Sequence, residues 1–170
     1  TIWVGTDEGL YEYIREKDKF VKHLHQYVKN IYITDDGYIW IGAPSGLFRF
    51  SITEKKLSAP DSKHKGFFNT QGNLSISRVM KDSRGVLWIG TNSNGLYEYH
   101  EDTDYLKNHM PNKADQYSIS GNQVRAIYED KLGRLWIGTK SDGLNLYDRG
   151  TGRFFHKSSP RNLPSNTVYN

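Results

Sequence analysis

Hydrophobic and polar positions alternate in short runs along the chain. The runs are rich in tyrosine, tryptophan, phenylalanine and β-branched residues, and turn-forming residues separate them at intervals of roughly 8 to 12 positions. Alternation with a period of two is typical of β-strands, and no stretch of useful length repeats with the period of a helix. The pattern therefore predicts an all-β chain.

One phrase recurs four times within this pattern. It reads Leu or Ile, Trp, Ile or Val, Gly, and then Thr or Ala, and a few polar residues separate it from a Gly-Leu step that opens a further strand. The copies occupy residues 2–6, 39–43, 87–91 and 135–139, with tryptophans at Trp3, Trp40, Trp88 and Trp136 and glycines at Gly5, Gly42, Gly90 and Gly138. Since the chain holds 4 tryptophans, every one of them occupies the same place in a repeat.

The spacing of the copies indicates propeller blades. The tryptophans are 37, 48 and 48 residues apart, close to the roughly 40 to 50 residues of a four-stranded blade. In the copy at 123–148, a β-prone run precedes the turn Asp130-Lys131-Leu132-Gly133, the tryptophan strand and the Gly-Leu strand, and a fourth strand follows at 153–156. One small twisted sheet cannot bury both of its faces, so neighbouring blades must stack. We expect the indoles to fill the wedges between blades and the nearby glycines to let the next sheet approach.

The repeats divide the chain into antiparallel blades that we expect to form a segment of a larger β-propeller. The boundaries run at 1–26, 27–74, 75–122 and 123–162, with 163–170 as the start of the next innermost strand. The first blade begins at its tryptophan strand and lacks an innermost strand, whereas 163–170 copies the approach to such a strand at 120–125. Four blades could close on themselves, two chains could complete each other, or the chain could belong to a longer polypeptide. An isolated chain should self-associate or close through residues 167–169.

With these phrases in view, the sequence resembles the two-component regulator propeller repeat. The fourth copy carries the resemblance at Val124, Glu129, Asp130, Gly133, the phrase 135–139, Gly143, Leu144, Tyr147 and Asp148. The second copy departs from it, because Thr34 stands in place of the turn aspartate and Pro44 follows Ala43. The resemblance covers essentially the whole chain, and the departures concern a turn more than the fold.

The resemblance implies a segment of the periplasmic sensor region of a hybrid two-component receptor. Such regions look like two seven-bladed propellers followed by a β-sandwich, a membrane helix, and cytoplasmic kinase and regulator modules. The implied function is non-catalytic: the propellers sense oligosaccharides derived from glycans and relay the signal to a histidine kinase outside this segment. The alternatives are a protein-interaction scaffold and, less favoured, a propeller lyase or hydrolase.

Composition narrows the chemistry further. The chain has no cysteine, which excludes thiolate metal sites and cysteine nucleophiles. Its 23 basic and 19 acidic residues are scattered, and the one basic cluster, at 55–65, lacks interleaved aromatic residues, so we expect no nucleic-acid partner. No apolar run approaches the roughly 20 residues that cross a bilayer, so we expect no membrane contact by this segment.

We expect no catalytic residue, no metal and no cofactor. His23 and His25 have strand-like ligand spacing but no third ligand in view, and the turns at Asp82 and Asp130 hold too few acids for calcium. The sequence has no nucleophile elbow and no phosphate-binding glycine loop, and its glycines recur with the blade period.

Ligand or partner contacts are expected on loops that depart from the repeat. The loops between second and third strands and the connections between blades lie on one face of a propeller, and amides, carboxylates and aromatic rings are the groups that recognise sugars. The candidates are His64, Phe67, Phe68, Asn69, Asn92, Asn94, His109, Asn112, Tyr117, Lys140 and Asp142. The predicted partners are an oligosaccharide and other blades, either of the parent chain or of a second copy.

Overall fold

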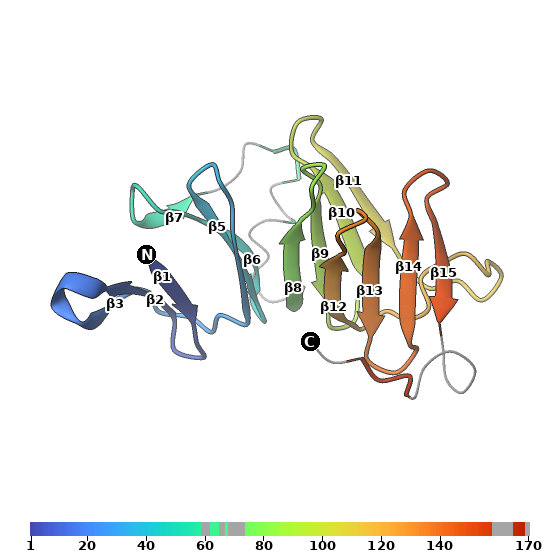
Figure 1. Cartoon of the computed structure of the whole chain (residues 1–170), viewed down its shortest axis with the longest axis horizontal. Coiled ribbons are helices and arrows are strands. Elements are labelled where there is room, and N and C mark those ends of the chain that lie inside the picture. The colour runs from blue at the N-terminus through green and yellow to red at the C-terminus, as the bar shows by residue number, and fades with distance from the viewer. Residues whose placement is uncertain (59–61, 65–66, 68–73, 158–164, 169–170) are drawn as a thin grey trace. The chain divides into compact units, whose positions relative to one another are not determined.

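The computed structural model describes residues 1–58, 62–64, 67, 74–157 and 165–168, which contain four small antiparallel sheets (Figure 1). The first sheet has three strands and the others have four. Apart from the 3-10 turn η1 (Arg15–Lys17), the elements whose bounds fall within the described residues are strands. The prediction of an all-β fold built from four-stranded antiparallel sheets is confirmed.

Within each sheet the strands lie side by side in the order of the sequence. The first sheet consists of β1 (Ile2–Gly5), β2 (Leu10–Ile14) and β3 (Lys19–Leu24). The second consists of β4 (Asn30–Ile33), β5 (Tyr38–Ala43), β6 (Gly46–Ser51) and β7 (Lys56–Ser58). The third consists of β8 (Ile76–Lys81), β9 (Leu87–Thr91), β10 (Leu96–His100) and β11 (Tyr105–His109). The fourth consists of β12 (Val124–Glu129), β13 (Leu135–Thr139), β14 (Leu144–Asp148) and β15 (Arg153–Lys157).

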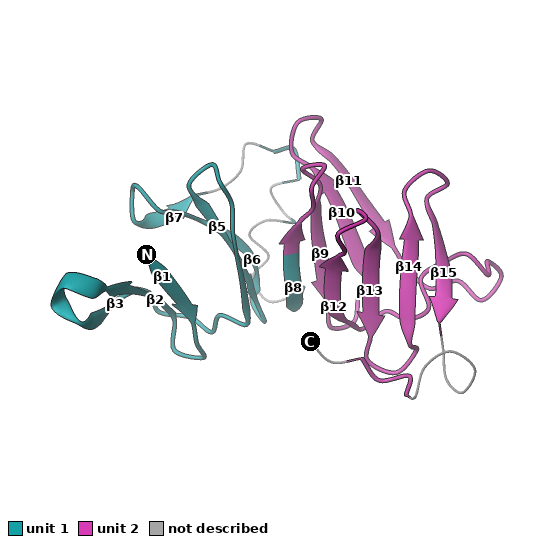
Figure 2. Cartoon of the chain, in the orientation of Figure 1, with its two compact units in different colours: residues 1–79 teal, residues 80–170 magenta. Residues whose placement is uncertain are grey.

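The chain forms two compact units, residues 1–79 and 80–170, and their boundary falls within β8 (Figure 2). Each unit has a hydrophobic core that joins two successive sheets. The core of the first unit contains Trp3, Leu10, Val28, Ile39, Ile41 and Phe50. The core of the second unit contains Val86, Trp88, Leu96, Ile119, Val124, Ile127, Leu135, Ile137, Tyr147 and Phe154. Burial of apolar area therefore stabilises pairs of sheets rather than single sheets.

The tryptophan of one sheet packs against an aromatic ring of the next. In the first unit, the ring of Trp3 meets the edge of Phe50 with centroids 5.5 Å apart. In the second unit, Trp88 meets Tyr147 in the same edge-on manner at 5.1 Å. Trp88 is only 1% exposed, so its indole is covered by the neighbouring sheet. Edge-to-face pairs of this kind stabilise a core beyond the effect of area alone.

The glycine two residues after Trp3, Trp40 and Trp136 provides space for a segment that follows the sheet. A Cβ atom added to Gly42 would lie 2.7 Å from Cγ2 of Ile76, which is closer than carbon atoms approach. Gly5 stands in the same relation to Val28, and Gly138 to Val168. Any side chain at these glycines would push the following segment away.

Candidate functional site

The threonine of the repeated phrase organises the loop between the second and third strands. In the fourth sheet, the Thr139 hydroxyl donates to the Gly143 carbonyl at 2.9 Å and accepts from the Asp142 amide at 3.1 Å. The loop after Thr91 in the third sheet has the same two bonds, at 2.8 and 2.7 Å. The threonine hydroxyl bonds the backbone groups on the inner side of the loop, and the side chains of residues 140–142 are exposed to solvent.

The segment 165–168 is fastened to this loop by backbone bonds. The Gly143 amide donates to the Asn166 carbonyl at 2.9 Å, and the Val168 amide donates to the Thr139 carbonyl at 3.2 Å. In the first unit, the Val28 amide donates to the Thr6 carbonyl at 2.7 Å in the same way. In both units, therefore, backbone hydrogen bonds connect the loop between the second and third strands with the segment that follows the sheet. We call this connection the loop joint.

A hollow of about 290 Å³ lies beside the joint of the fourth sheet and is lined by Arg125, Lys140, Ser141, Thr167 and Val168. The Lys140 amide donates to the Gln123 carbonyl at 2.9 Å, which holds the loop against the start of β12. The pairing of β12 with β13 changes register between Val124 and Ala126, so Arg125 is the extra residue of a bulge. Bulges redirect a side chain and are frequent beside functional sites.

The hollow is cationic. Its described lining holds two basic side chains, two hydroxyl groups and one aliphatic side chain, with no carboxylate among them. Within the described part of the chain, no ion-pair partner faces the guanidinium of Arg125 or the ammonium of Lys140. Both groups are therefore available to a ligand with hydrogen-bond acceptors.

The structure brings only some of the predicted residues to this region. Lys140 lines the hollow, whereas Asp142 turns its carboxylate toward Gly121, which leaves room for it only because it has no side chain. Asn92 and Asn94 lie in the equivalent loop of the third sheet and are half-buried. Asn94 is held there by its amide, which donates to Thr91 at 2.7 Å.

The remaining candidates lie elsewhere. His109 ends β11 and is buried, with Nε2 2.8 Å from a carboxylate oxygen of Glu98. Asn112 is exposed and caps its own loop by accepting the Ala114 amide at 3.0 Å. The ring of Tyr117 lies under the guanidinium of Arg153 at 4.4 Å.

The connection after β7 holds the last four candidates. The Phe67 amide donates to the His64 carbonyl at 2.8 Å. Phe68 and Asn69 lie outside the described residues. Their role in ligand contact stays a prediction.

Sequence reasoning missed the polar groups that tie a turn to its tryptophan. Oδ1 of Asp82 accepts the amides of Arg84 and Val86 at 2.9 and 3.0 Å, and its Oδ2 accepts the Trp88 indole at 2.7 Å. Asp130 does the same for its own turn and for Trp136, whose indole lies at 2.9 Å. The indole bond lowers the pKa of Asp130 below its usual range. The recurrence of Asp six residues before Trp is the signal that could have revealed this link.

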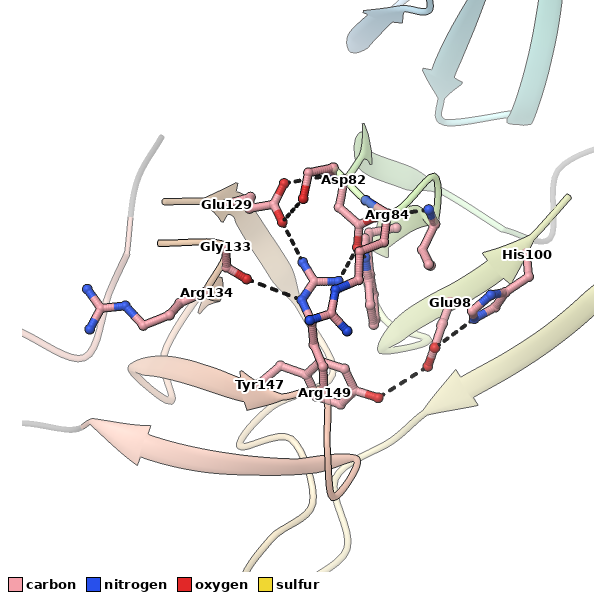
Figure 3. A network of polar contacts seen from close by, with 12 residues as sticks. Asp82, Arg84, Glu98, His100, Glu129, Gly133, Arg134, Tyr147 and Arg149 are labelled. Carbon is pink, nitrogen blue, oxygen red and sulfur yellow. Dashed lines mark hydrogen bonds and ion pairs between the residues drawn. The ribbon is translucent and has the colours of Figure 1, made fainter. Parts of the chain in front are cut away.

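An arginine connects the third and fourth sheets at the opposite ends of their strands (Figure 3). The Arg149 guanidinium bonds the Asp82 carboxylate, donates to Glu129 at 2.8 Å and donates to the Gly133 carbonyl at 3.3 Å. Glu129 in turn accepts the Ser83 hydroxyl at 2.8 Å. Burial would raise the pKa of Asp82, but the bonds from Trp88 and Arg149 outweigh it and keep the carboxyl charged.

A second carboxylate, that of Glu98, links the same pair of sheets. Glu98 is bonded by His109 at 2.8 Å. It is also bonded by His100 at 2.9 Å and accepts the Tyr147 hydroxyl at 3.4 Å (Figure 3). Burial alone would raise the pKa of Glu98, but the two histidines lower it to about 2. Burial beside Glu98 raises the pKa of Tyr147. These groups are bonded to one another and serve the packing of the sheets.

Two features are missing from the described residues. Among them, no three histidine, aspartate or glutamate side chains gather closely enough to hold a metal ion. In the same part of the chain, no helix has the length and apolar character that a membrane crossing requires.

The fold and the repeat agree with comparisons to known proteins. The sequence matches the two component regulator propeller family at residues 70–93 and 118–141. A comparison with curated proteins gave no match. The family resemblance is thus supported by the third and fourth copies of the phrase, which contain the described turns at Asp82 and Asp130.

Solved structures resemble nearly the whole chain. The extracellular domain of BT4673 from B. thetaiotaomicron, described as a hybrid two component system, is 18% identical with a TM-score of 0.75, over 98% of this chain and 21% of that one. The extracellular domain of BT3049 from the same organism, described in the same terms, is 22% identical with a TM-score of 0.73, over 99% of this chain and 22% of that one. PorZ, a surface component of the type-IX secretion system of Porphyromonas gingivalis, is 18% identical with a TM-score of 0.57, over 83% of this chain and 20% of that one.

The chain spans about a fifth of the length of these proteins, and at such low identity the likeness shows the fold. The fold in common is the one that the repeat predicted. Together with the Trp-centred sheets, it identifies the chain as a run of β-propeller blades, in which residues 70–93 and 118–141 match the two component regulator propeller family.

Proposed function

We propose that the chain is a non-catalytic segment of a periplasmic sensor propeller in a hybrid two-component system. In this proposal it binds oligosaccharides derived from glycans and passes the binding event to a histidine kinase elsewhere in the parent protein. The family match and the likeness to extracellular domains of hybrid two component systems support this direction. A sensor needs a ligand site and a way to transmit its occupancy, and the fourth sheet offers both.

The hollow at Lys140 is the observation that carries the proposal. Its cations and hydroxyls are available to a ligand, whereas the carboxylates of Asp82 and Glu98 are occupied by neighbouring sheets. Hydroxyl-rich ligands are recognised by convergent donors and acceptors of this kind. We therefore place ligand binding at the loop joint.

The same joint provides a route for the signal. A ligand in the hollow touches both the loop of the fourth sheet and the segment 165–168, which are held together by the Val168–Thr139 and Gly143–Asn166 bonds. Ligand contacts that favour the closed joint would stabilise the packing of one blade on the next. The coupling free energy can be no larger than the difference in ligand affinity between the two packings.

Binding of a glycan panel to the chain, followed by hydrogen exchange, tests this function. We expect at least one oligosaccharide to bind, to be recovered chemically unchanged, and to slow exchange of the Gly143 and Val168 amides. Cleavage of the bound sugar would contradict a non-catalytic role. Failure of every saccharide to bind would contradict the sensor role of this segment.

A further inference from the structure

The lysine in the hollow is not required by the repeat. The residue that follows the repeated phrase is Asp7 in the first copy, Pro44 in the second and Asn92 in the third, whereas the fourth has Lys140. A residue needed for blade packing would recur with the blade period, as the tryptophan and the glycine do. The packing of the blades therefore does not account for the positive charge at this position, which is a feature of the hollow alone.

The arginine in the hollow is presented by an irregularity of the strand. Arg125 is the unpaired residue of the bulge in β12, so its side chain does not follow the alternation of the neighbouring positions. A planar guanidinium matches the two oxygen atoms of a carboxylate or sulfate, and an ammonium adds a second point of charge. Arg125 and Lys140 line the same hollow of about 290 Å³.

The acidic neighbour in the loop does not cancel this charge. Asp142 lies two residues beyond Lys140, but its carboxylate fills the space beside Gly121 and does not line the hollow. The hydroxyls of Ser141 and Thr167 complete the wall. The volume of about 290 Å³ lies just below the roughly 300–1,000 Å³ of ligand pockets, which suits one sugar unit better than a long chain.

We infer that the hollow lined by Arg125, Lys140, Ser141 and Thr167 recognises the acidic group of a charged sugar, either a carboxylate or a sulfate. The inference rests on the proposed sensor function and specifies the ligand of the same site. The two cations bind the acidic group, and the two hydroxyls bond the ring hydroxyls. A neutral sugar of the same shape would leave the two cations without an anionic partner.

Three matched sugars test the inference on the intact chain. Glucose, glucuronate and glucose 6-sulfate differ at the sixth carbon, and their dissociation constants can be measured from backbone amide shifts of Lys140, Ser141 and Thr167. We expect glucuronate or glucose 6-sulfate to bind about tenfold or more tightly than glucose, because a charged hydrogen bond is stronger than a neutral one. The tighter of the two acidic sugars identifies the source of the charge.

Variants separate local recognition from general attraction. Arg125→Gln and Lys140→Gln should each weaken binding of the acidic sugar about tenfold and weaken binding of glucose by a clearly smaller factor. Lys131→Gln is the matched control, since Lys131 is exposed on the β12–β13 turn and does not line the hollow. An equal loss in the control would overturn the inference, because the effect would then be one of net charge.

Other outcomes distinguish the inference from the function on which it rests. Inorganic sulfate that binds as tightly as the acidic sugars would contradict recognition of a sugar. Equal affinity for glucose and the acidic sugars, or binding of only neutral oligosaccharides from the panel, would refute the inference and leave the sensor function standing. If neither the panel nor the acidic sugars bind, both fail.

Discussion

The guanidinium of Arg149, in the turn after β14, bonds the carboxylate of Asp82, in the turn after β8. The Asp82 side chain is fully buried and also accepts the Trp88 indole at 2.7 Å. One carboxylate therefore holds the tryptophan of its own sheet and the arginine of the next. A buried carboxylate is costly without a cation, so the pair links the stability of the third sheet to that of the fourth.

Replacing Arg149 by methionine should strongly destabilise the second unit. The methionine side chain still fills the space of the arginine stem, but the buried Asp82 carboxylate loses its cation. We expect a loss of about 3–5 kcal/mol in the free energy of unfolding, measured in urea. The control is Arg134→Met, which removes the bond to Asp130 from a side chain that is 52% exposed. It should cost less than about 1 kcal/mol. Equal losses in the two variants would refute the special role of Arg149.

Adjacent sheets use the same pair of positions with opposite charge. Lys81 donates to Glu101 at 2.7 Å in the third sheet, whereas Glu129 accepts from Arg149 at 2.8 Å in the fourth. We expect Lys81→Glu to cost about 0.5–1 kcal/mol through repulsion from Glu101, and Glu101→Lys in the same chain to restore most of it. A double-mutant cycle from urea unfolding measures the coupling. Additive effects would show that the pair contributes nothing.

Acid should weaken the contact at Glu98. Its pKa in the folded chain is about 2, below the ordinary value of 4.5, so the carboxylate stabilises the fold above about pH 4.5. This contribution, on the order of 3 kcal/mol, falls as the pH drops from 4.5 through 2. We expect the difference in unfolding free energy between the wild-type chain and Glu98→Gln to shrink across this range. Parallel stability curves for the two chains would contradict the assignment.

Alanine at Gly5 should loosen the first unit. The added methyl group would collide with Val28, whose side chain is 3% exposed, and we expect a loss of about 1–3 kcal/mol. Gly150→Ala is a suitable comparison, because its methyl group would meet only the Asp148 carboxylate, at 3.3 Å. That change should stay within about 0.5 kcal/mol. Thermal unfolding followed by tryptophan fluorescence measures both, and equal shifts would show that the close approach at Gly5 is unimportant.

The sequence predicted the sheets well because each depends on local pattern. The phrase around Trp88 specifies β9, and the Gly-Leu step specifies β10, through alternation and turn residues close in sequence. The bond between Arg149 and Asp82 could not be predicted in this way, since it joins residues 67 positions apart across two sheets. The partner of Arg149 depends on how the fourth sheet packs against the third.

The candidate site was predictable only in part. Lys140 was a candidate because it lies on a loop between the second and third strands of a blade, whereas Arg125 reaches the same hollow through a bulge that alternation does not encode. His109 was a candidate because the sequence pattern placed it in a connection between blades. It ends β11 instead, where the weak alternation of 105–109 gave no sign of a buried strand end.

The bond from Arg149 to Asp82 has a consequence for how the order of the repeats can change during evolution. The third copy has Glu101 where the fourth has Arg149, each two residues after the tyrosine of its third strand. If recombination exchanged the order of these two copies, Glu101 would face Asp130 and two carboxylates would meet. The two copies share a fold but are not interchangeable, so an exchange of their order would require a change of charge at this one position.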